Sequence, residues 1–370
     1  MALWVLMAIS LAGGLDTVPV PITSRQACPA CRIWGSPVAT LRNPGDRFPV
    51  DPGPDQTIAR DTRGWFYLVS PTRPDQVVVF DPRGVAVRTL GRGGGGPGEF
   101  RSAVLLAIGP GDTLFVWDRS ARRISVFTPA PVSTLARTLP FPHSMTGGGF
   151  LVEPGGGFIA NADLGHAAHF GRFIHRYSGR GLHLASWGRE EVVIRSDLQA
   201  RVRSLARSRV GLWTLRSNSY RMELWDSSGT IRRDMRRLDP GLPDYRRNEI
   251  RPDRAPDPVY LGIQEGDDGL LTVLVLVPDR RWKEATRFRR GPHGMDFEWL
   301  DLDRAFDTQI EVIDPASARL LKMQRFDQVF TQFIGPSLVA AISARPDSAS
   351  TLSVWHITFE HSARRPGGSN

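Results

Sequence analysis

The chain is almost without lysine. Lys283 and Lys322 are its only lysines, so arginine supplies all but two of the 47 basic residues. With 38 acidic residues the net charge is +9, and the charges are scattered and interleaved rather than gathered in one run. Binding to nucleic acid or anionic lipid favours a concentrated basic patch. The pattern therefore predicts a solvated, arginine-rich surface and no nucleic-acid partner.

Cysteine is nearly as rare, with Cys28 and Cys31 in the sequence ACPACR as the only two. A structural zinc site needs four ligands, and this segment supplies two. A redox CxxC motif belongs in a βαβ unit, which is missing here, and haem attachment would need histidine where Arg32 stands. An oxidising compartment favours a local disulfide. We expect that disulfide, with free thiols and a metal or redox role as the alternatives.

No apolar run that we identified is long enough to cross a bilayer, so we expect no transmembrane span. Residues 2–15 (ALWVLMAISLAGGL) have the length of a signal-peptide core and are too short to span a membrane. We expect residues 1–24 to form a signal peptide, which predicts an extracytoplasmic protein, periplasmic or secreted. The alternatives are an uncleaved anchor and a buried N-terminal strand. At the other end, we expect residues 361–370 to form a disordered tail.

Glycine and proline are abundant, at 37 and 29 residues, and 41% of the chain is hydrophobic. This composition fits a folded protein with many turns and short strands. Residues 57–100 contain four β-type runs, at 57–60, 65–69, 76–80 and 85–90, separated by turn sequences. Four strands per module is the unit of a β-propeller blade.

Two markers show that this module repeats. A bulky residue followed by a polar turn ends the third run at Phe80, Phe127, Tyr177, Trp225 and Ile313, with spacings of 47, 50, 48 and 88 residues. A glycine or small residue opens the second run of six modules, where we expect a turn that needs φ above zero. Both markers predict blades at roughly 57–98, 103–140, 148–190, 200–238, 258–325 and 326–360.

The sixth module has only three strands. Residues 37–41 (PVATL) are β-like and can supply the fourth, which would close the ring without an open sheet edge. The expected fold is thus all-β, a six-bladed β-propeller of four-stranded antiparallel blades closed by an N-terminal strand. We expect residues 25–56 to hold the cysteine pair and the closing strand, and residues 57–360 to form the propeller.

The turn FDPRG at 80–84, followed by the glycine-rich segment GRGGGGPGEF at 91–100, resembles bacterial six-bladed β-propellers related to the NHL-repeat and TolB-like proteins. The resemblance covers about residues 57–360. It implies a scaffold that is often exported, and it implies no particular reaction.

Two short motifs are candidate binding sites for a cofactor or a metal ion. Gly91, Gly93 and Gly96 satisfy GxGxxG, but a dinucleotide site needs a preceding parallel strand and a following helix, so we interpret the run as a connection between blades. Asp163, His166 and His169 are a candidate site for a divalent metal, in the turn after the second strand of blade three. Loop histidines that are merely solvated are the alternative. We expect no other cofactor.

Residues 278–306 form an insertion in blade five, with a basic first half and an acidic second half. Long insertions in compact repeats are commonly functional or mobile, and aromatic residues are enriched at interfaces. The alternatives are a self-packed lid and a disordered one. The candidate ligand-binding residues here are Arg281, Trp282, Phe288, Phe297 and Trp299.

We identify no converging catalytic set, so the leading hypothesis is an exported monomeric scaffold, not an enzyme, that binds a protein, peptide or glycan through loops on one rim. The alternative is a metal-assisted hydrolase or lyase in the central channel. The innermost strands offer such an enzyme Arg60, Asp61, Glu153, Gln264 and Asp327, a mixed set in which no single chemistry dominates, whereas a divalent site needs several converging oxygen ligands. RNA binding is a third possibility, which the expected leader argues against.

Overall fold

The computed structural model describes residues 18–361 apart from 49, 51–55, 166–168, 170, 190–200, 246–249, 292–293 and 345–349. Most of the expected leader, His166 and nearly all of the expected tail therefore lie outside the described residues. Within the described part, no helix is both long and apolar enough to cross a membrane.

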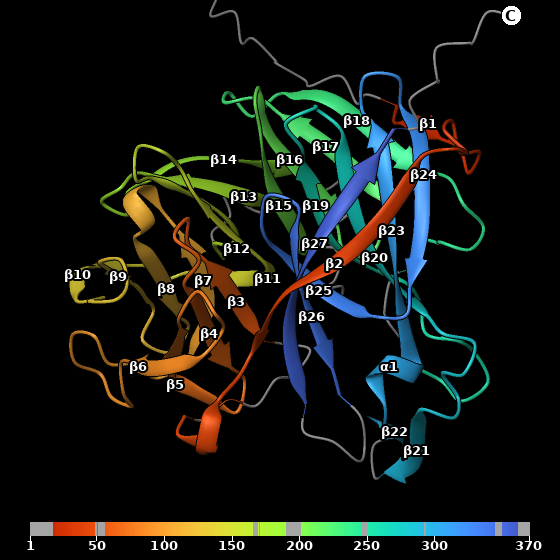
Figure 1. The fold of residues 1–370 in the computed structure, drawn as a ribbon. Coiled ribbons are helices and arrows are strands. Elements are labelled where there is room, and N and C mark those ends of the chain that lie inside the picture. Colours follow the sequence, from red (N-terminus) through yellow and green to blue (C-terminus); the bar gives the residue numbers. More distant parts are fainter. Residues whose placement is uncertain are drawn as a thin grey trace, which may run out of the picture.

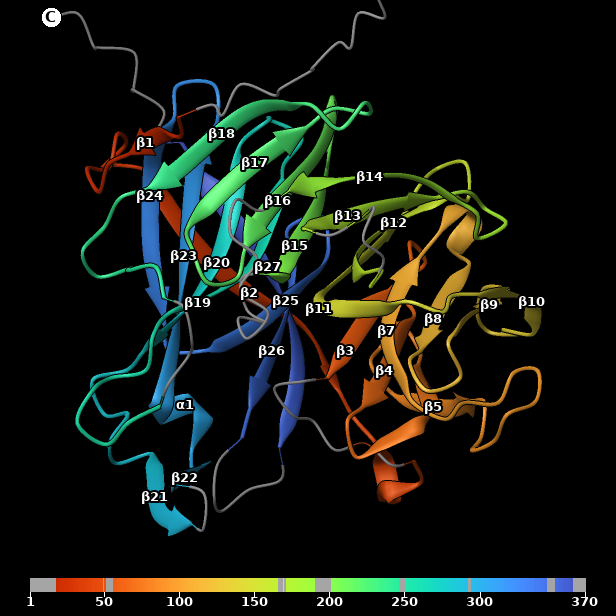
Figure 2. The same cartoon turned by 180° about the vertical axis from the view of Figure 1, so that it is seen from behind.

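Six small antiparallel sheets are arranged in a ring, and the first strands of successive blades contact one another around it (Figure 1, Figure 2). The predicted six-bladed propeller is confirmed, including its closure by an N-terminal strand. Blade one consists of β3 (Thr57–Arg60), β4 (Phe66–Ser70), β5 (Arg73–Phe80) and β6 (Ala86–Leu90). Blade two consists of β7 (Ala103–Ile108), β8 (Leu114–Asp118), β9 (Arg123–Phe127) and β10 (Leu135–Pro140). Blade three consists of β11 (Ser144–Val152), β12 (Phe158–Asp163), β13 (Arg172–Tyr177) and β14 (His183–Arg189). Blade four consists of β15 (Arg203–Ser208), β16 (Gly211–Arg216), β17 (Arg221–Trp225) and β18 (Ile231–Arg237). Blade five consists of β19 (Val259–Glu265), β20 (Leu271–Pro278), β23 (Phe306–Asp314) and β24 (Arg319–Phe326). Blade six consists of β25 (Val329–Gly335), β26 (Leu338–Ser343), β27 (Thr351–Glu360) and β2 (Arg32–Leu41).

Polar side chains on the innermost strands join neighbouring blades. Thr57 Oγ1 and Ser204 Oγ donate to backbone carbonyls of the next blade's inner strand, at 2.7 and 2.6 Å. Gln264 Nε2 donates in the same way to blade six at 2.9 Å, and Gln332 Nε2 donates to blade one. Because buried polar groups must find partners, these contacts engage inner-strand side chains that could otherwise face the channel.

A side-chain acceptor shapes the turn that gives the repeat its period. In blade one, Asp81 Oδ1 accepts from the backbone N–H groups of Arg83 and Val85, at 3.0 and 2.9 Å. Asp226 in blade four and Ser178 in blade three accept at the same two offsets. The Ser178 hydroxyl accepts the same two backbone hydrogen bonds as the aspartate carboxylate, so serine can take the place of aspartate in blade three.

Gly84 ends the first of these turns and lies against the closing strand. Its φ is +79°, and an added Cβ would lie 2.6 Å from the backbone oxygen of Thr40 in β2. We expect Gly84→Ala to lower the free energy of unfolding by more than the about 1–2 kcal/mol that a left-handed conformation costs alone. Gly45→Ala is the matched control, since Gly45 has φ +67° with nothing within 4 Å. Equal denaturation midpoints for the two variants would contradict the contact with β2.

The glycine that opens the second strand has two different roles. Gly64, Gly156 and Gly269 have positive φ, as the sequence predicted. Gly211 does not, so the expectation was wrong there. A Cβ on Gly211 would lie 1.9 Å from the backbone oxygen of Trp225 on the neighbouring strand, so close approach of two backbones excludes a side chain at this position.

The described segment before the first blade forms an N-terminal arm, residues 18–41, that crosses the outer edges of three blades (Figure 1). Its first strand, β1 (Val20–Ile22), adds in parallel to β18 of blade four, and the side chain of Ile22 is fully buried. The backbone N–H groups of Ala27 and Cys28 then donate to β24 of blade five. Finally β2 pairs with β27 and completes blade six. Strand β1 lies inside residues 1–24, which we expected to form a signal peptide. If a signal peptide is cleaved from this chain, the cleavage must occur before Val20 for β1 to be present in the mature protein.

The blade-five insertion forms a hairpin and a single helical turn. Strands β21 (Thr286–Gly291) and β22 (Gly294–Trp299) pair with each other, and α1 (Leu302–Ala305) returns the chain to β23. The hairpin extends beyond the blade at the lower edge of Figure 1. A small core at its base packs against blade six, because Ala285, Leu302 and Ala305 lie in one buried cluster with Val329 and Ile342.

Candidate functional site

Blade four places one arginine at the same level on each of its four strands. Arg203 of β15 is opposite Arg216 of β16, and Arg221 of β17 is opposite Arg236 of β18. The β16–β17 register runs to Leu215 and Met222, so Arg216 and Arg221 are the next pair along. Residues directly opposite in a sheet share a face. These four residues, the arginine row, therefore lie on one face of the blade.

The row becomes more exposed from the inside of the propeller outward. Arg203 is buried, and the side chains of Arg216, Arg221 and Arg236 are 18, 24 and 46% exposed. Three carboxylates accompany the four guanidinium groups. Arg216 pairs with Glu223 at 2.9 Å, Arg221 pairs with Asp234, and Arg236 pairs with Asp244 at 2.6 Å.

Burial and the neighbouring charges both shift pKa values along the row. Burial is the main reason that the pKa of Arg203 falls to about 9, and the charges of Arg216 and Arg221 lower it further, against the opposing effect of Glu223. Burial alone would raise the pKa of Glu223, but the three guanidinium groups around it hold that pKa below its usual range. The guanidinium groups of the row therefore stabilise a carboxylate placed beside them.

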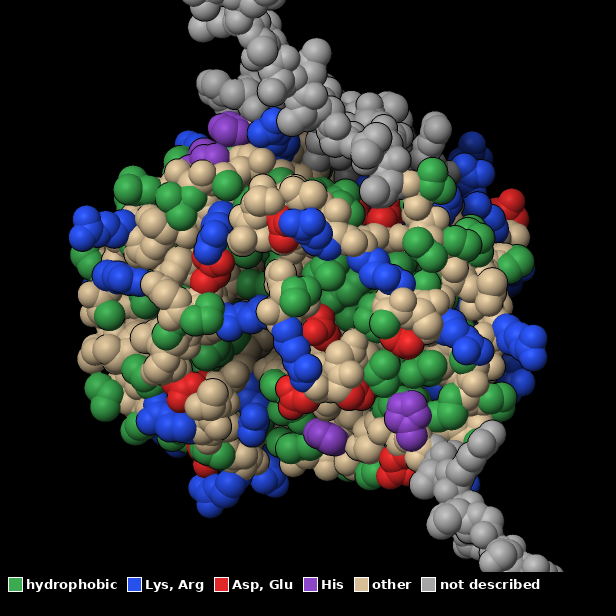
Figure 3. Space-filling view, turned by 90° about the horizontal axis from the view of Figure 1, so that it is seen from above, with side chains coloured by type: hydrophobic (Ala, Val, Ile, Leu, Met, Phe, Trp, Pro, Cys, Tyr) green, Lys and Arg blue, Asp and Glu red, His purple; other side chains and the backbone are tan. Residues whose placement is uncertain are grey.

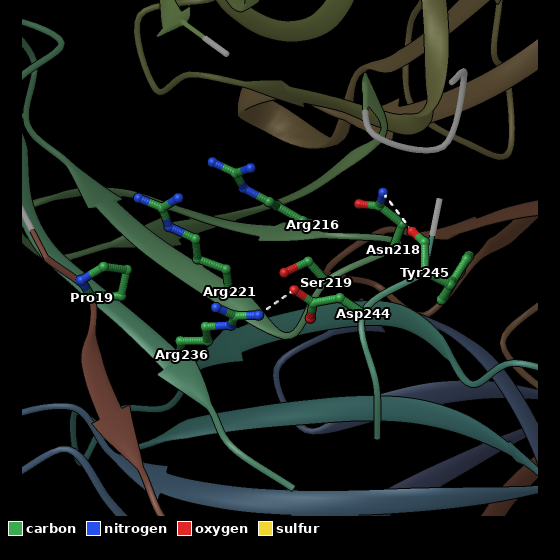
Figure 4. A pocket seen from close by; sticks show the side chains of 8 residues that line it. All are labelled: Pro19, Arg216, Asn218, Ser219, Arg221, Arg236, Asp244 and Tyr245. Atoms are coloured by element: carbon green, nitrogen blue, oxygen red, sulfur yellow. Dashed lines mark hydrogen bonds and ion pairs between the residues drawn. The ribbon is translucent and has the colours of Figure 1, made fainter. Parts of the chain in front are cut away.

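The outer part of the row opens into a pocket of about 390 Å³. Figure 4 shows Arg216, Arg221 and Arg236 projecting from neighbouring strands, with Asp244 across from Arg236. Asn218 donates to the backbone oxygen of Tyr245 at 3.0 Å and holds the far wall. The complete lining is Pro19, Arg216, Asn218, Ser219, Arg221, Arg236, Asp244 and Tyr245.

Three of the five polar residues considered for chemistry in the channel, Asp61, Glu153 and Gln264, make other contacts. Asp61 accepts from the backbone of Trp65 at 2.8 Å and from the Tyr67 hydroxyl, so it shapes a turn. Glu153 pairs with Arg176 at 3.0 Å, and Gln264 bonds to blade six. Figure 3 shows acidic and basic side chains interleaved over the face seen from above.

Two of the expected metal residues of blade three, Asp163 and His169, contact different groups in the structure. Asp163 pairs with Arg201 at 2.9 Å, and its other oxygen accepts from Gly165 N–H. His166 lies outside the described residues. His169 instead lies beside His175 and His183, with ring centroids 6.3 and 4.9 Å away.

His175 is fully buried, and burial lowers its pKa to about 4 despite a hydrogen bond to the backbone oxygen of Ala162. His183 and His169 lower this pKa further. The candidate set drawn from the sequence includes neither His175 nor His183, because only the pairing of β13 with β14 brings both of them to His169.

The expected ligand-binding residues of the insertion are largely packed against one another. Trp282 is buried, with Phe288 edge-on to its ring, and Trp299 contacts Phe306. Arg281 pairs with Asp279 at 3.0 Å. Phe297 is the most open aromatic of the expected set, at 44% exposed.

Cys28 and Cys31 form a disulfide with a Cα–Cα distance of 5.3 Å. Cys31 Sγ also lies 3.8 Å from His361 Nδ1. Among the described residues, these three form the one group of at least three Cys, His, Asp or Glu side chains whose ligand atoms all lie within 4.8 Å of one another. Because both thiols are in the disulfide, neither cysteine can supply a thiolate ligand to a metal here.

No protein-family model matches the chain, and no curated protein matches it in sequence. Its fold is similar to that of a Bacteroides fragilis protein provisionally described as exported, with a TM-score of 0.59 and 9% identity over 92% of this chain and 100% of that one. Two further similar structures are virginiamycin B lyase from Staphylococcus aureus (TM-score 0.43, 10% identity, 88% and 99% covered) and the PQQ-bound aldose sugar dehydrogenase of Streptomyces coelicolor (0.46, 13%, 90% and 100%). At these identities the likeness shows the propeller fold alone, so a closer relation to NHL-repeat or TolB-like proteins stays a prediction.

Proposed function

We propose that this chain is an exported, non-catalytic β-propeller that binds an acidic ligand at the arginine row of blade four. The row itself carries the proposal. Like charges directly opposite each other destabilise a sheet, and blade four places arginine beside arginine across all four strands. An anion bound at the open end would offset that repulsion.

The geometry of the row fits a ligand with several charges. Neighbouring strands are about 4.8 Å apart, so the three arginines that line the pocket, Arg216, Arg221 and Arg236, span about 10 Å. Guanidinium groups bind carboxylate, sulfate and phosphate oxygens in pairs. The pocket volume of about 390 Å³ lies in the range of small-ligand sites. A peptide or glycan with acidic groups on successive units matches these dimensions.

Other parts of the chain support the remaining elements of the proposal. The contacts of Asp61, Glu153 and Gln264 favour a structural use of these inner-strand groups over catalysis. Export is supported by the apolar run at residues 2–15 and by a disulfide of the kind that oxidising compartments maintain.

Arg236→Gln tests the site, because Arg236 is half exposed and its loss should leave the fold intact. We expect its affinity for a hexaglutamate peptide to fall at least about tenfold, since hydrogen bonds between charged groups contribute roughly 1.5–3 kcal/mol. Hexaglutamine should not bind, and added salt should weaken the hexaglutamate complex. Titration calorimetry measures the hexaglutamate affinity of the variant, the absence of hexaglutamine binding and the effect of salt.

Arg232→Gln is the matched control. Arg232 lies on the same strand, is 63% exposed in its side chain and does not line the pocket. If both variants lose affinity equally, the peptide is attracted by the net charge of the protein and the site is wrongly assigned.

A further inference from the structure

Three histidine rings of blade three converge on one serine hydroxyl. Ser186 Oγ lies 2.8 Å from His175 Nδ1, 2.7 Å from His183 Nε2 and 3.1 Å from His169 Nδ1. Three imidazole nitrogens therefore lie within 3.1 Å of a single point.

The sheet register creates this convergence. On the paired strands β13 and β14, His175 is opposite Ser186 and Tyr177 is opposite His183. His169 comes from the connection between β12 and β13. The three histidines thus have different surroundings: His175 is fully buried, whereas His183 is exposed and His169 lies outside the strands.

The hydrogen bonds of His175 fix which nitrogen faces the cluster. Its Nε2 lies 3.1 Å from the carbonyl oxygen of Ala162. A carbonyl can only accept, so Nε2 carries the proton and the neutral ring turns the lone pair of Nδ1 toward Ser186. Donation of the second ring N–H to a backbone carbonyl is the arrangement that orients metal-bound histidines.

The Ser186 hydroxyl can form hydrogen bonds with all three rings in only one arrangement of donors and acceptors. It has a single proton to donate, which goes to His175, so the other two rings must donate N–H groups to Oγ. A cation at the same point would accept a lone pair from every ring. Zinc–nitrogen bonds are about 2.0–2.1 Å long, so each nitrogen needs to move inward by about 0.6–1.1 Å while Ser186 rotates away. At least two of the three nitrogens lie more than 4.8 Å apart, so the rings must also come closer to one another when the ion binds.

We propose that His169, His175 and His183 bind one late first-row divalent transition metal ion, for which Zn²⁺ is the reference. Imidazole ligands suit zinc, copper and nickel, whereas Mg²⁺ and Ca²⁺ prefer oxygen. The set differs from the one that the sequence suggested, because Asp163 pairs with Arg201. Three histidines leave a fourth position for water or Ser186.

Calorimetric titration of the oxidised protein with ZnCl₂ tests the assignment. We expect one Zn²⁺ per chain and no saturation by MgCl₂ or CaCl₂. Loss of a residue that only hydrogen-bonds to a metal ligand typically weakens metal binding about 10–100-fold. Because His183 would be a direct ligand, His183→Ala should weaken Zn²⁺ binding by at least that factor. Because His183 is exposed, this variant should keep the wild-type melting temperature. Substitution with Co²⁺ gives a second readout, a visible spectrum typical of tetrahedral nitrogen ligation.

Two controls separate this site from other histidines. His143 lies near the cluster, with its ring centroid 6.4 Å from that of Tyr177, and no described bond joins it to Ser186. His361 lies beside the disulfide. His143→Ala and His361→Ala should both bind Zn²⁺ as the wild type does, and Ser186→Ala should bind at least as tightly. The proposal is overturned if the wild type takes up no Zn²⁺, if His183→Ala binds normally, or if either control loses the ion.

Discussion

Replacing Arg237 by leucine is expected to lower the free energy of unfolding by about 3–5 kcal/mol, because it leaves a buried carboxylate without its cation. Arg237 of β18 pairs with Glu311 of β23 at 3.0 Å, and both side chains are fully buried between blades four and five. Burial by itself would lower the pKa of Arg237, but Glu311 outweighs burial and raises it. The Tyr220 hydroxyl also donates to Glu311, at 2.9 Å.

The double variant Arg237→Leu with Glu311→Leu should recover most of that loss, since replacing both charges by apolar groups removes the uncompensated carboxylate. The matched control is Arg287→Leu, in an exposed ion pair with Glu298 at 3.4 Å, where we expect less than about 1 kcal/mol. Urea denaturation of the four proteins measures the difference. A double variant no more stable than Arg237→Leu would show that the stability does not depend on matched charge.

Replacing Ile33 by aspartate is expected to open the ring. Ile33 lies on the closing strand β2, is 5% exposed and packs in one cluster with Phe330 and Ile357 of blade six. Ile33→Ala should cost about 2–5 kcal/mol, and Ile33→Asp should cost more because it also buries an unpaired charge. Limited proteolysis should then cut within residues 18–41 of the aspartate variant at denaturant concentrations where the wild type resists.

Trp34→Ala gives the matched comparison on the same strand, since Trp34 points the other way and is 44% exposed. Its stability should stay within about 0.5 kcal/mol of the wild type. If Ile33→Asp and Trp34→Ala had the same proteolytic pattern, closure by β2 would not limit the opening of the ring.

Local sequence was enough to predict the blades, because the turns that divide them are local. The acceptor at Asp81 or Asp226 and the glycine that follows act within a few residues. The closing strand was found from residues 37–41, although β2 begins at Arg32. Strand β1 was not predicted, because a three-residue edge strand has almost no pattern of its own and forms only against β18.

The candidate site could not be predicted in the same way. Arg203, Arg216, Arg221 and Arg236 are irregularly spaced along the chain, and only the register of four strands brings them into one row. The charges therefore looked scattered. The histidines show the same limit, because a local HxxH pattern drew attention to His166 and His169, while the partners of His169 come from two paired strands.

The N-terminal arm also determines when the molecule can be completed. Ile22 contacts Leu238, Ala27 contacts Leu320 and Arg32 contacts Glu360, so an arm that precedes all six blades in the chain is among the last segments to find its partners. Contacts of such sequence separation slow folding, and until they form, the edges of β18 and β27 are open to pairing with other chains. In a chain that crosses a membrane N-terminus first, the arm would arrive long before its partners and would have to stay unpaired until the last blade followed.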